Sequence, residues 1–169
     1  MKVTSLRGAG HGFTFVELLI TIALIGLLSM LALPLYEVSA TRMKEAELRR
    51  ALRTIREGID VYKAATDAGS LPRATGESGY PPSLEVLTQS LDLAGKRDPS
   101  GSIASQRMVI LRQLPRDPFS SDAEVPAALT WNTRSYASRP DDPQPGPDVF
   151  DVSSKSGRTG LDGTSYASW

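Results

Sequence analysis

The chain has 169 residues, with 19 basic and 19 acidic side chains, one histidine and no cysteine. The balanced charge leaves no general excess of Lys and Arg to attract phosphates, so no nucleic-acid partner is expected. The lack of cysteine excludes disulfides and thiolate metal sites. A single histidine, His11, excludes histidine dyads and zinc sites built on several imidazoles. The length suits one modest domain with an anchor.

Composition separates two segments at the start of the chain. Residues 1–12 (MKVTSLRGAGHG) form a short tail with Lys2, Arg7 and no acid. Residues 13–35 (FTFVELLITIALIGLLSMLALPL) are apolar, and Glu17 is their only ionisable side chain. A helix over this second segment would be about 34 Å long, whereas a hydrocarbon core is roughly 30 Å thick. Residues 13–35 are therefore predicted to span a membrane.

The continuation, residues 36–66, has the pattern of an amphipathic helix. It contains no proline and one glycine, Gly58. Its apolar residues recur at intervals of three and four, which places them on one face of a helix. They are Leu48, Leu52, Ile55, Ile59 and Tyr62. Because only Pro34 interrupts the pattern, we predict one helix of about 50 residues, with its first half in lipid and its second half packed on a small domain.

Two local features of this helix carry separate predictions. Pro34 removes one backbone donor and is expected to bend or loosen the helix near the membrane surface. Oppositely charged residues four apart are expected to pair on the exposed sides. These pairs are Glu45 with Arg49, Arg53 with Glu57, and Arg56 with Asp60.

Residues 67–169 have the composition of a small globular region rich in turns. Eleven of the twelve prolines follow residue 70. A short helix is predicted to open at Pro81–Leu87 with Ser83 as its N-cap. Strands are predicted at Arg107–Leu111, Trp131–Ala137 and Val149–Ser153, with Arg139–Asp148 as an irregular hairpin loop between the last two. The predicted fold class is α+β, a long N-terminal helix packed on one small antiparallel sheet.

The boundary between tail and apolar helix carries the most specific pattern. The sequence runs Gly12-Phe13-Thr14-Phe15-Val16-Glu17, so one carboxylate lies five residues after a glycine. A charge in mid-membrane costs on the order of 3 kcal/mol, less near an interface, and persists when a partner offsets it. Cleavage after Gly12 would give Phe13 a free ammonium. In a side-by-side stack of helices, that ammonium is able to pair with Glu17 of a neighbouring copy.

This segment strongly resembles the type IV pilin and type II secretion pseudopilin superfamily. The resemblance covers roughly residues 6–60 and implies that residues 1–12 are a leader. A prepilin peptidase would cleave between Gly12 and Phe13 and methylate the new amine of Phe13. Glu17 would guide docking into a filament, and Pro34 lies where these proteins commonly have a helix-loosening proline.

A secretory signal peptide and a plain membrane anchor are the two alternatives for the N-terminal segment. A signal peptide, cut for example after Val38-Ser39-Ala40, does not explain Glu17 or so long an apolar run. A plain anchor explains the length but leaves Glu17 without a partner.

The charges on either side of the span conflict with a C-terminal domain outside the cytoplasm. Five basic residues follow the span against two before it, and basic residues are usually more frequent on the cytoplasmic side. The five are Arg42, Lys44, Arg49, Arg50 and Arg53.

The C-terminal half resembles the major (G-type) pseudopilins. The matching pieces are residues 114–119 (LPRDPF), Tyr136, residues 150–154 (FDVSS) and a Gly- and Asp-containing end closing on Trp169. Those proteins commonly bind calcium in the terminal loop. Residues 153–169 supply one acid, Asp162, whereas calcium takes six to eight oxygens, so no calcium site is carried over and no cofactor is expected.

Several polar and aromatic residues of this half have simple structural interpretations. Asp162-Gly163 is expected to form a turn, and Asp117, after Arg116, to cap or close one. The tryptophans at positions 131 and 169 are expected to pack between sheet and helix. The acid pairs Asp141-Asp142 and Asp148-Asp151 are expected to be solvated turn residues rather than catalytic carboxylates. No nucleophile and base pair is recognised, so no enzymatic activity is expected.

The resemblance implies a structural subunit of a type II secretion pseudopilus, which polymerises through its N-terminal helix and helps to export folded proteins. Its expected partners are further copies, sibling minor pseudopilins, the prepilin peptidase and the inner-membrane assembly platform. The expected location is the inner membrane, with one span and a periplasmic C-terminal domain. The alternative is a subunit of a type IV pilus, which the absence of cysteine mildly disfavours.

Overall fold

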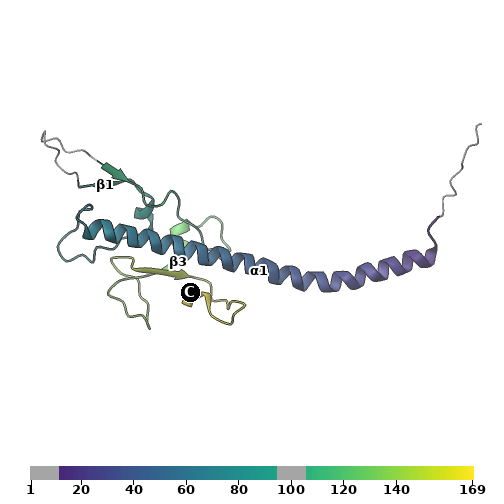
Figure 1. Cartoon of the computed structure of the whole chain (residues 1–169). Helices are drawn as coiled ribbons and strands as arrows, with labels where there is room; N and C mark the ends of the chain where they lie inside the picture. The colour runs from purple at the N-terminus through teal and green to yellow at the C-terminus, as the bar shows by residue number, and fades with distance from the viewer. Residues whose placement is uncertain (1–11, 95–105) are drawn as a thin grey trace, which may run out of the picture. The chain divides into compact units, whose positions relative to one another are not determined.

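A single helix, α1, accounts for most of the regular structure in the computed structural model, which describes residues 12–94 and 106–169. It runs from Phe15 to Asp67, and Pro34 lies inside it without ending it. The chain divides into two units, residues 1–41 and 42–169. The predicted long helix is therefore present (Figure 1).

The first part of α1 is apolar and unburied. Between Phe15 and Leu35 the described side chains are exposed. In the described part of the chain, α1 is the one helix long and apolar enough to be a candidate membrane span. The boundaries predicted for a leader, a span and a globular region stay predictions.

The end of α1 has a clear local cause. Gly69 has a positive φ of 70°, which only glycine adopts without strain. The backbone N–H groups of Gly69 and Ser70 then donate to the carbonyls of Thr66 and Ala65, at 3.0 and 2.9 Å. These bonds satisfy carbonyl groups that the last turn of a helix leaves without partners.

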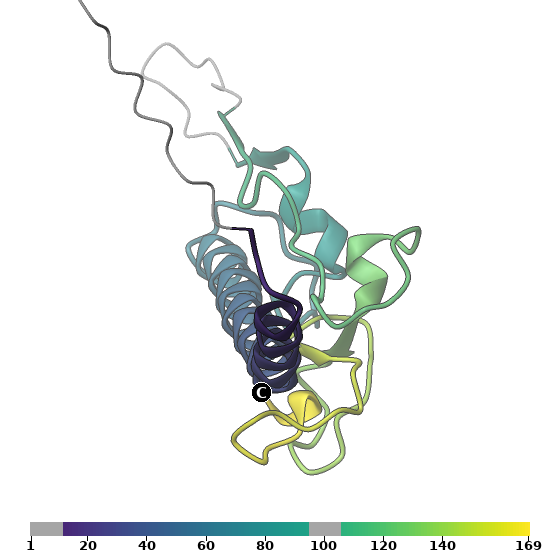
Figure 2. The ribbon, with the colours of Figure 1, turned by 90° about the vertical axis from the view of Figure 1, so that its right-hand side faces the viewer.

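The predicted stripe on α1 is the centre of the hydrophobic core in residues 42–169. Leu48, Leu52, Ile55 and Ile59 are almost completely buried. They pack in one cluster with residues from later elements, namely Leu84, Leu87, Leu114, Trp131, Val149, Val152 and Tyr166. Tyr62, the last predicted member of the stripe, is partly buried against the same cluster. Figure 2 shows the later elements of residues 42–169 gathered on one side of the helix.

The predicted second helix is a short 3-10 helix, η1, at Leu84–Thr88. Leu84 and Leu87 give it a buried face. Ser83 occupies the N-cap position, as predicted, although its side chain makes no capping hydrogen bond. Two further 3-10 helices are η2, Ala127–Thr130, and η3, Tyr166–Ser168.

The described residues form two small antiparallel sheets where one was predicted. Strand β1, Leu91–Leu93, pairs with β2, Gln106–Met108, and β3, Trp131–Arg134, pairs with β4, Asp151–Ser154. The first pair was missed because β1 has three residues and no β-branched side chain to signal a strand. β2 ends at Met108 rather than continuing to Leu111, whose N–H donates instead to the Leu87 carbonyl at 2.8 Å.

The β3–β4 hairpin agrees with the predicted order of strand, irregular loop and strand. Trp131 pairs with Ser154, and Arg134 pairs with Asp151. The alternation along β4 buries Val152 and Ser154 and leaves Asp151 and Ser153 partly exposed. Both strands are shorter than predicted, because the chain on either side enters the loop that Asp148 holds.

Candidate functional site

The segment before α1 places the predicted cleavage bond in an accessible position. Gly12, Phe13 and Thr14 are not helical, and all three are exposed. Phe13 is 82% exposed. A Cβ added to Gly12 would meet no atom within 4 Å, so packing within the described residues does not require glycine there. The Gly12–Phe13 bond therefore lies in a non-helical, exposed part of the chain. The remainder of the predicted leader, residues 1–11, lies outside the described residues.

Thr14 and Glu17 together start α1. The backbone N–H of Glu17 donates to Oγ1 of Thr14 at 3.2 Å, which is an N-cap interaction. Glu17 lies in the first turn, where the positive end of the helix dipole favours an acid. The spacing Thr-x-x-Glu is the capping-box pattern, a signal that the sequence interpretation of Glu17 missed. Glu17 therefore has one local role, and its exposed carboxylate is still accessible to a second molecule.

The predicted site residues form one group with one outlier. Gly12, Phe13 and Glu17 lie together at the start of α1. Pro34 lies 17 residues beyond Glu17 in the sequence, which is about 25 Å along a helix. Pro34 therefore takes no part in the N-terminal group.

The C-terminal segment is held to α1 by a buried carboxylate. Glu45 is 6% exposed, and its Oε1 accepts hydrogen bonds from the N–H of Leu161 at 2.7 Å and the hydroxyl of Tyr166 at 3.0 Å. The predicted exposed pair of Glu45 with Arg49 is therefore wrong. The signal was available, because Glu45 lies three residues before Leu48 and extends the buried stripe by one position.

Asp162 is a turn residue with engaged oxygens. Its Oδ1 accepts from the N–H and the hydroxyl of Thr164, at 3.0 and 2.6 Å, and its Oδ2 lies 3.1 Å from Arg49. Gly163 follows with a φ of 82°, as the predicted turn requires. The pKa of Asp162 is lowered, mainly by the hydrogen bonds from Thr164. Residues 12–94 and 106–169 contain no cluster of three or more potential metal-ligating side chains of His, Cys, Asp or Glu.

These contacts predict that calcium has no effect on stability. Glu45, Arg49 and Thr164 provide the contacts that hold the C-terminal segment, and an added cation would have to displace Arg49 from Asp162. We expect the full chain in detergent to unfold at the same temperature with calcium as with a chelator. The fluorescence of Trp131 and Trp169 reports this unfolding. A reproducible rise in the unfolding temperature with calcium would contradict this prediction and indicate a calcium site.

Arg56 joins three parts of the C-terminal unit. Its Nε donates to Oδ1 of Asp151 at 2.8 Å, and its Nη2 donates to the carbonyls of Val152 and Trp169 at 3.0 and 2.7 Å. The predicted pair of Arg56 with Asp60 is thus replaced by a long-range one. Sequence spacing gave no signal for this contact, since Asp151 lies 95 residues away.

Asp117 caps a turn, as predicted, and is also buried. It is 3% exposed, accepts from the N–H of Phe119 at 2.8 Å, and accepts from the hydroxyl of Ser154 at 2.5 Å. Arg116 donates to the backbone carbonyls of Asp122 and Val125 and so fixes the loop that follows.

The two tryptophans differ in their surroundings. Trp131 is 2% exposed in the core, and its indole N–H donates to the Pro115 carbonyl at 2.9 Å. Trp169 is only partly buried; it makes an edge contact with Tyr166 and lies under the guanidinium of Arg49, 4.1 Å from the ring centroid. The predicted packing role is confirmed for Trp131, and Trp169 packs at the edge of the core.

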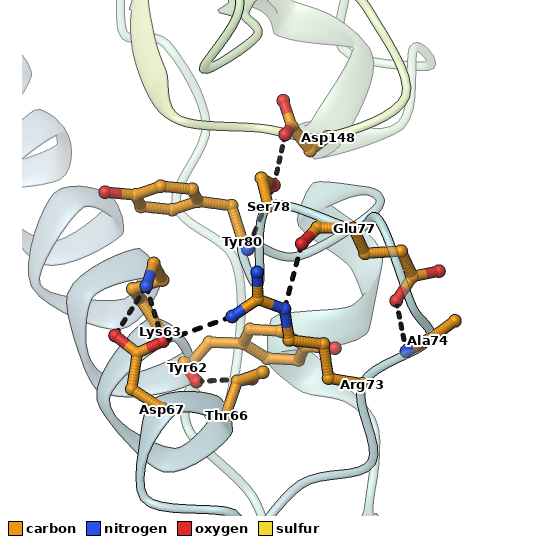
Figure 3. Close-up of polar contacts among 10 residues, drawn as sticks. All are labelled: Tyr62, Lys63, Thr66, Asp67, Arg73, Ala74, Glu77, Ser78, Tyr80 and Asp148. Carbon is orange, nitrogen blue, oxygen red and sulfur yellow. Dashed lines mark hydrogen bonds and ion pairs between the residues drawn. The ribbon is translucent and has the colours of Figure 1, made fainter.

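Asp148 is a buried anchor, which corrects the prediction of a solvated turn residue. Its Oδ1 accepts from the Ser135 hydroxyl at 2.6 Å and the Tyr136 N–H at 2.9 Å, and its Oδ2 accepts from the Ser78 hydroxyl. Figure 3 shows Ser78 reaching Asp148 from the loop after α1. Asp148 therefore connects the hairpin loop to this earlier loop.

The same loop is fastened to the end of α1 by charged groups (Figure 3). Asp67 accepts from Lys63 at 2.5 Å and lies 3.8 Å from Arg73. Arg73 in turn donates to the carbonyl of Glu77 at 2.9 Å. Among the other acids of the predicted pairs, Asp151 pairs with Arg56 and Arg134. Asp141 and Asp142 are exposed, as expected; Asp141 pairs with Arg139, and Asp142 accepts from the side-chain amide of Gln144.

Asp148 gives the protein a specific pH dependence. Burial would raise the pKa of its carboxyl, but hydrogen bonds from Ser135, Ser78 and Tyr136 outweigh burial and lower the pKa below 3.8. A lowered pKa stabilises the folded state above the unfolded pKa, and this stabilisation is lost as the pH falls through the folded pKa. We expect Asp148→Asn to cost about 1–3 kcal/mol at pH 7.

Urea unfolding of the full chain and the variant at pH 7 and near pH 3 measures this difference. The cost should shrink near pH 3, because the carboxyl in the unfolded parent chain is then protonated and part of the stabilisation from the charged form is lost. An equal cost at both pH values would show that the charge of Asp148 contributes nothing.

Comparison of the chain with protein-family models, curated proteins and solved structures gave no match. The functional interpretation therefore depends on the residues and on the geometry described above.

Proposed function

We propose that the chain is a structural subunit of a type II secretion pseudopilus. A prepilin peptidase removes residues 1–12 and methylates the amine of Phe13. The processed chain is held in the inner membrane by the apolar part of α1, with its C-terminal unit in the periplasm. It polymerises with further copies and sibling minor pseudopilins on the inner-membrane assembly platform, and the filament helps to export folded proteins.

One observation carries this proposal. An exposed, non-helical Gly12–Phe13 bond immediately precedes a long apolar helix whose first turn holds one exposed carboxylate, Glu17. A peptidase needs an accessible bond. Phe13 and Glu17 lie four residues apart, so the new amine of one copy is able to reach the carboxylate of a parallel copy that is displaced along the helix axis. The extensive uncovered apolar surface of α1 supports burial in lipid or against further helices.

Mass spectrometry of the membrane-bound chain tests the processing step. We expect a mature chain that begins at Phe13 and carries one added methyl group. Substitution Gly12→Leu should leave the leader attached, with Gly26→Leu as the matched control inside the span. Recovery of the full-length chain from cells that contain a prepilin peptidase would contradict the proposal.

Deletion of the gene separates secretion from a surface pilus. We expect loss of exoprotein release with surface pili intact, and complementation by the parent chain should restore release. Loss of pili with intact secretion would instead support the type IV pilus alternative.

A further inference from the structure

One side of α1 within residues 42–67 carries charges sorted by sign. Arg50, Arg53, Glu57 and Asp60 follow at intervals of three, four and three, which places them in one strip along the helix. All four are exposed. Figure 2 shows the described elements that follow α1 gathered on one side of this part of the helix. The strip is therefore a solvent-facing surface, basic at its start and acidic at its end.

The four strip residues have no ion-pair partner among the described residues. In the part of the chain that the structure describes, no salt bridge within 4.0 Å includes any of them. Two charges beside the strip are paired: Arg49 lies 3.1 Å from Asp162, and Asp67 lies 2.5 Å from Lys63. The charges earlier on this part of α1, Arg42, Lys44 and Glu47, are like the strip residues in this respect. Arg53 and Glu57 also stand in the less favourable order for a pair four residues apart.

We propose that this strip, Arg50–Asp60, is a contact with a second copy of the chain. The second copy is parallel and displaced by seven residues, which is about 10.5 Å along the helix. Arg50 of one copy then lies level with Glu57 of the next, and Arg53 lies level with Asp60. This inference rests on the proposed polymerisation, and it adds the surface and the register.

Other arrangements of two copies place like charges together or are excluded by the membrane. Without displacement, arginines face arginines and acids face acids, which is repulsive. An antiparallel arrangement would require the apolar segments of two copies to leave the same membrane in opposite directions. Parallel arrangements with a displacement satisfy both restrictions. A shift of seven residues opposes two pairs of unlike charges from the strip, whereas a shift of four or ten residues opposes only one.

The flanking residues are consistent with the same displacement. A shift of seven residues also brings four like-charge pairs level with one another: Arg42 with Arg49, Arg49 with Arg56, Arg56 with Lys63, and Asp60 with Asp67. In each pair the second residue already has an opposite charge inside its own chain: Asp162 for Arg49, Asp151 for Arg56, Asp67 for Lys63 and Lys63 for Asp67. The shift also has the same direction as the proposed contact of Phe13 with Glu17.

The charges of the strip mainly determine how far one copy is displaced along the other. They contribute little to the free energy of association. Exposed ion pairs are weak, and physiological salt screens them over about 8 Å. Complementary charges across an interface chiefly reject wrong arrangements. Filament yield should therefore respond to charge reversal, whereas the fold of each subunit should not.

Charge reversal in the full chain tests the contact. We expect Arg50→Glu with Arg53→Glu, or Glu57→Arg with Asp60→Arg, each to lower filament yield about ten-fold, because attraction becomes repulsion. Co-expression of the two variants should restore assembly, and so should all four substitutions in one chain. A double variant with the same change in net charge elsewhere, Arg107→Glu with Arg139→Glu, is the control. Membrane abundance and protease resistance verify that each subunit is folded.

Disulfide trapping tests the register, since the parent chain has no cysteine. Glu57 and Ala64 lie seven residues apart near the centre line of the strip, and both are exposed. Cells that co-express Glu57→Cys and Ala64→Cys should give a linked dimer, and either variant alone should not. The ion pairs of the contact are kept in this dimer, because the copy with Glu57→Cys contributes Arg50 and Arg53 and the other copy contributes Glu57 and Asp60. A disulfide forms only where Cα atoms approach within about 7 Å.

The two proposals fail in different ways. If the parent chain assembles but both reversals assemble equally well, or if Glu57→Cys alone is linked, the strip contact is overturned and the proposed function stands. If the parent chain keeps residues 1–12 and forms no filament with its complete machinery, the proposed function itself is overturned. Failure of mutual rescue between the two reversed variants would also overturn the strip contact.

Discussion

Replacement of Glu17 by leucine should abolish filament assembly while cleavage at Gly12–Phe13 continues. Leucine favours insertion into lipid but cannot accept the amine of a neighbouring Phe13, which would then be buried without a counter-charge. Truncating one partner of a buried charge pair costs about 2–5 kcal/mol, a factor of at least ten in association. Filament yield and the mass of the mature N-terminus measure the two effects separately.

Matched variants distinguish the two roles of Glu17. Thr14→Ala removes the N-cap, which contacts the Glu17 N–H at 3.2 Å, but keeps the carboxylate. This variant should assemble nearly as well as the parent, since a lost cap costs about 1 kcal/mol of helix stability. Glu17→Asp keeps the charge on a shorter side chain and should assemble at an intermediate level. Equal damage from Thr14→Ala and Glu17→Leu would show that Glu17 acts only at the helix start.

Replacement of Glu45 by alanine should have the largest effect on the stability of the C-terminal unit. It leaves the buried hydroxyl of Tyr166 and the N–H of Leu161 without their acceptor. An unsatisfied buried donor such as the Tyr166 hydroxyl costs about 1–3 kcal/mol, and the Leu161 N–H, which is only partly buried, costs less. We therefore expect a loss of about 2–4 kcal/mol. Urea unfolding of the full chain in detergent, followed by tryptophan fluorescence, measures this loss.

Two controls separate the hydrogen bonds of Glu45 from its charge and its location. Glu45→Gln keeps an acceptor oxygen and should retain much of the stability. Arg49→Ala removes an exposed contact to the same C-terminal segment, 3.1 Å from Asp162, and should cost at most about 1 kcal/mol. If Arg49→Ala proves as damaging as Glu45→Ala, the surface pair rather than the buried carboxylate holds the segment.

The local sequence pattern was sufficient to predict those parts of the fold that depend on residues close together in the sequence. The three- and four-residue spacing of Leu48, Leu52, Ile55 and Ile59 predicts both the helix and its buried face. The turn at Asp162-Gly163 and the hairpin between residues 131 and 154 follow from turn residues and alternation. These features are encoded within a few residues, so a single sequence suffices to find them.

Long-range polar contacts were beyond the reach of the same reasoning. Arg56 pairs with Asp151 rather than with Asp60, four residues away. Asp148 was expected in solvent but collects donors from residues 78, 135 and 136. Charge alone does not indicate whether an acid is solvated or buried, because burial depends on which distant donors the fold supplies.

By itself, the sequence determined one long helix with an apolar first part and the single carboxylate near the Gly12–Phe13 bond. All of these are properties of consecutive residues along one helix. Only the tertiary structure decided that Glu45 is buried and that Arg50, Arg53, Glu57 and Asp60 stay uncovered, since both outcomes depend on which side of α1 the later chain covers. The physical reason is that helical spacing fixes which residues share a face, whereas packing decides which face is left for another molecule.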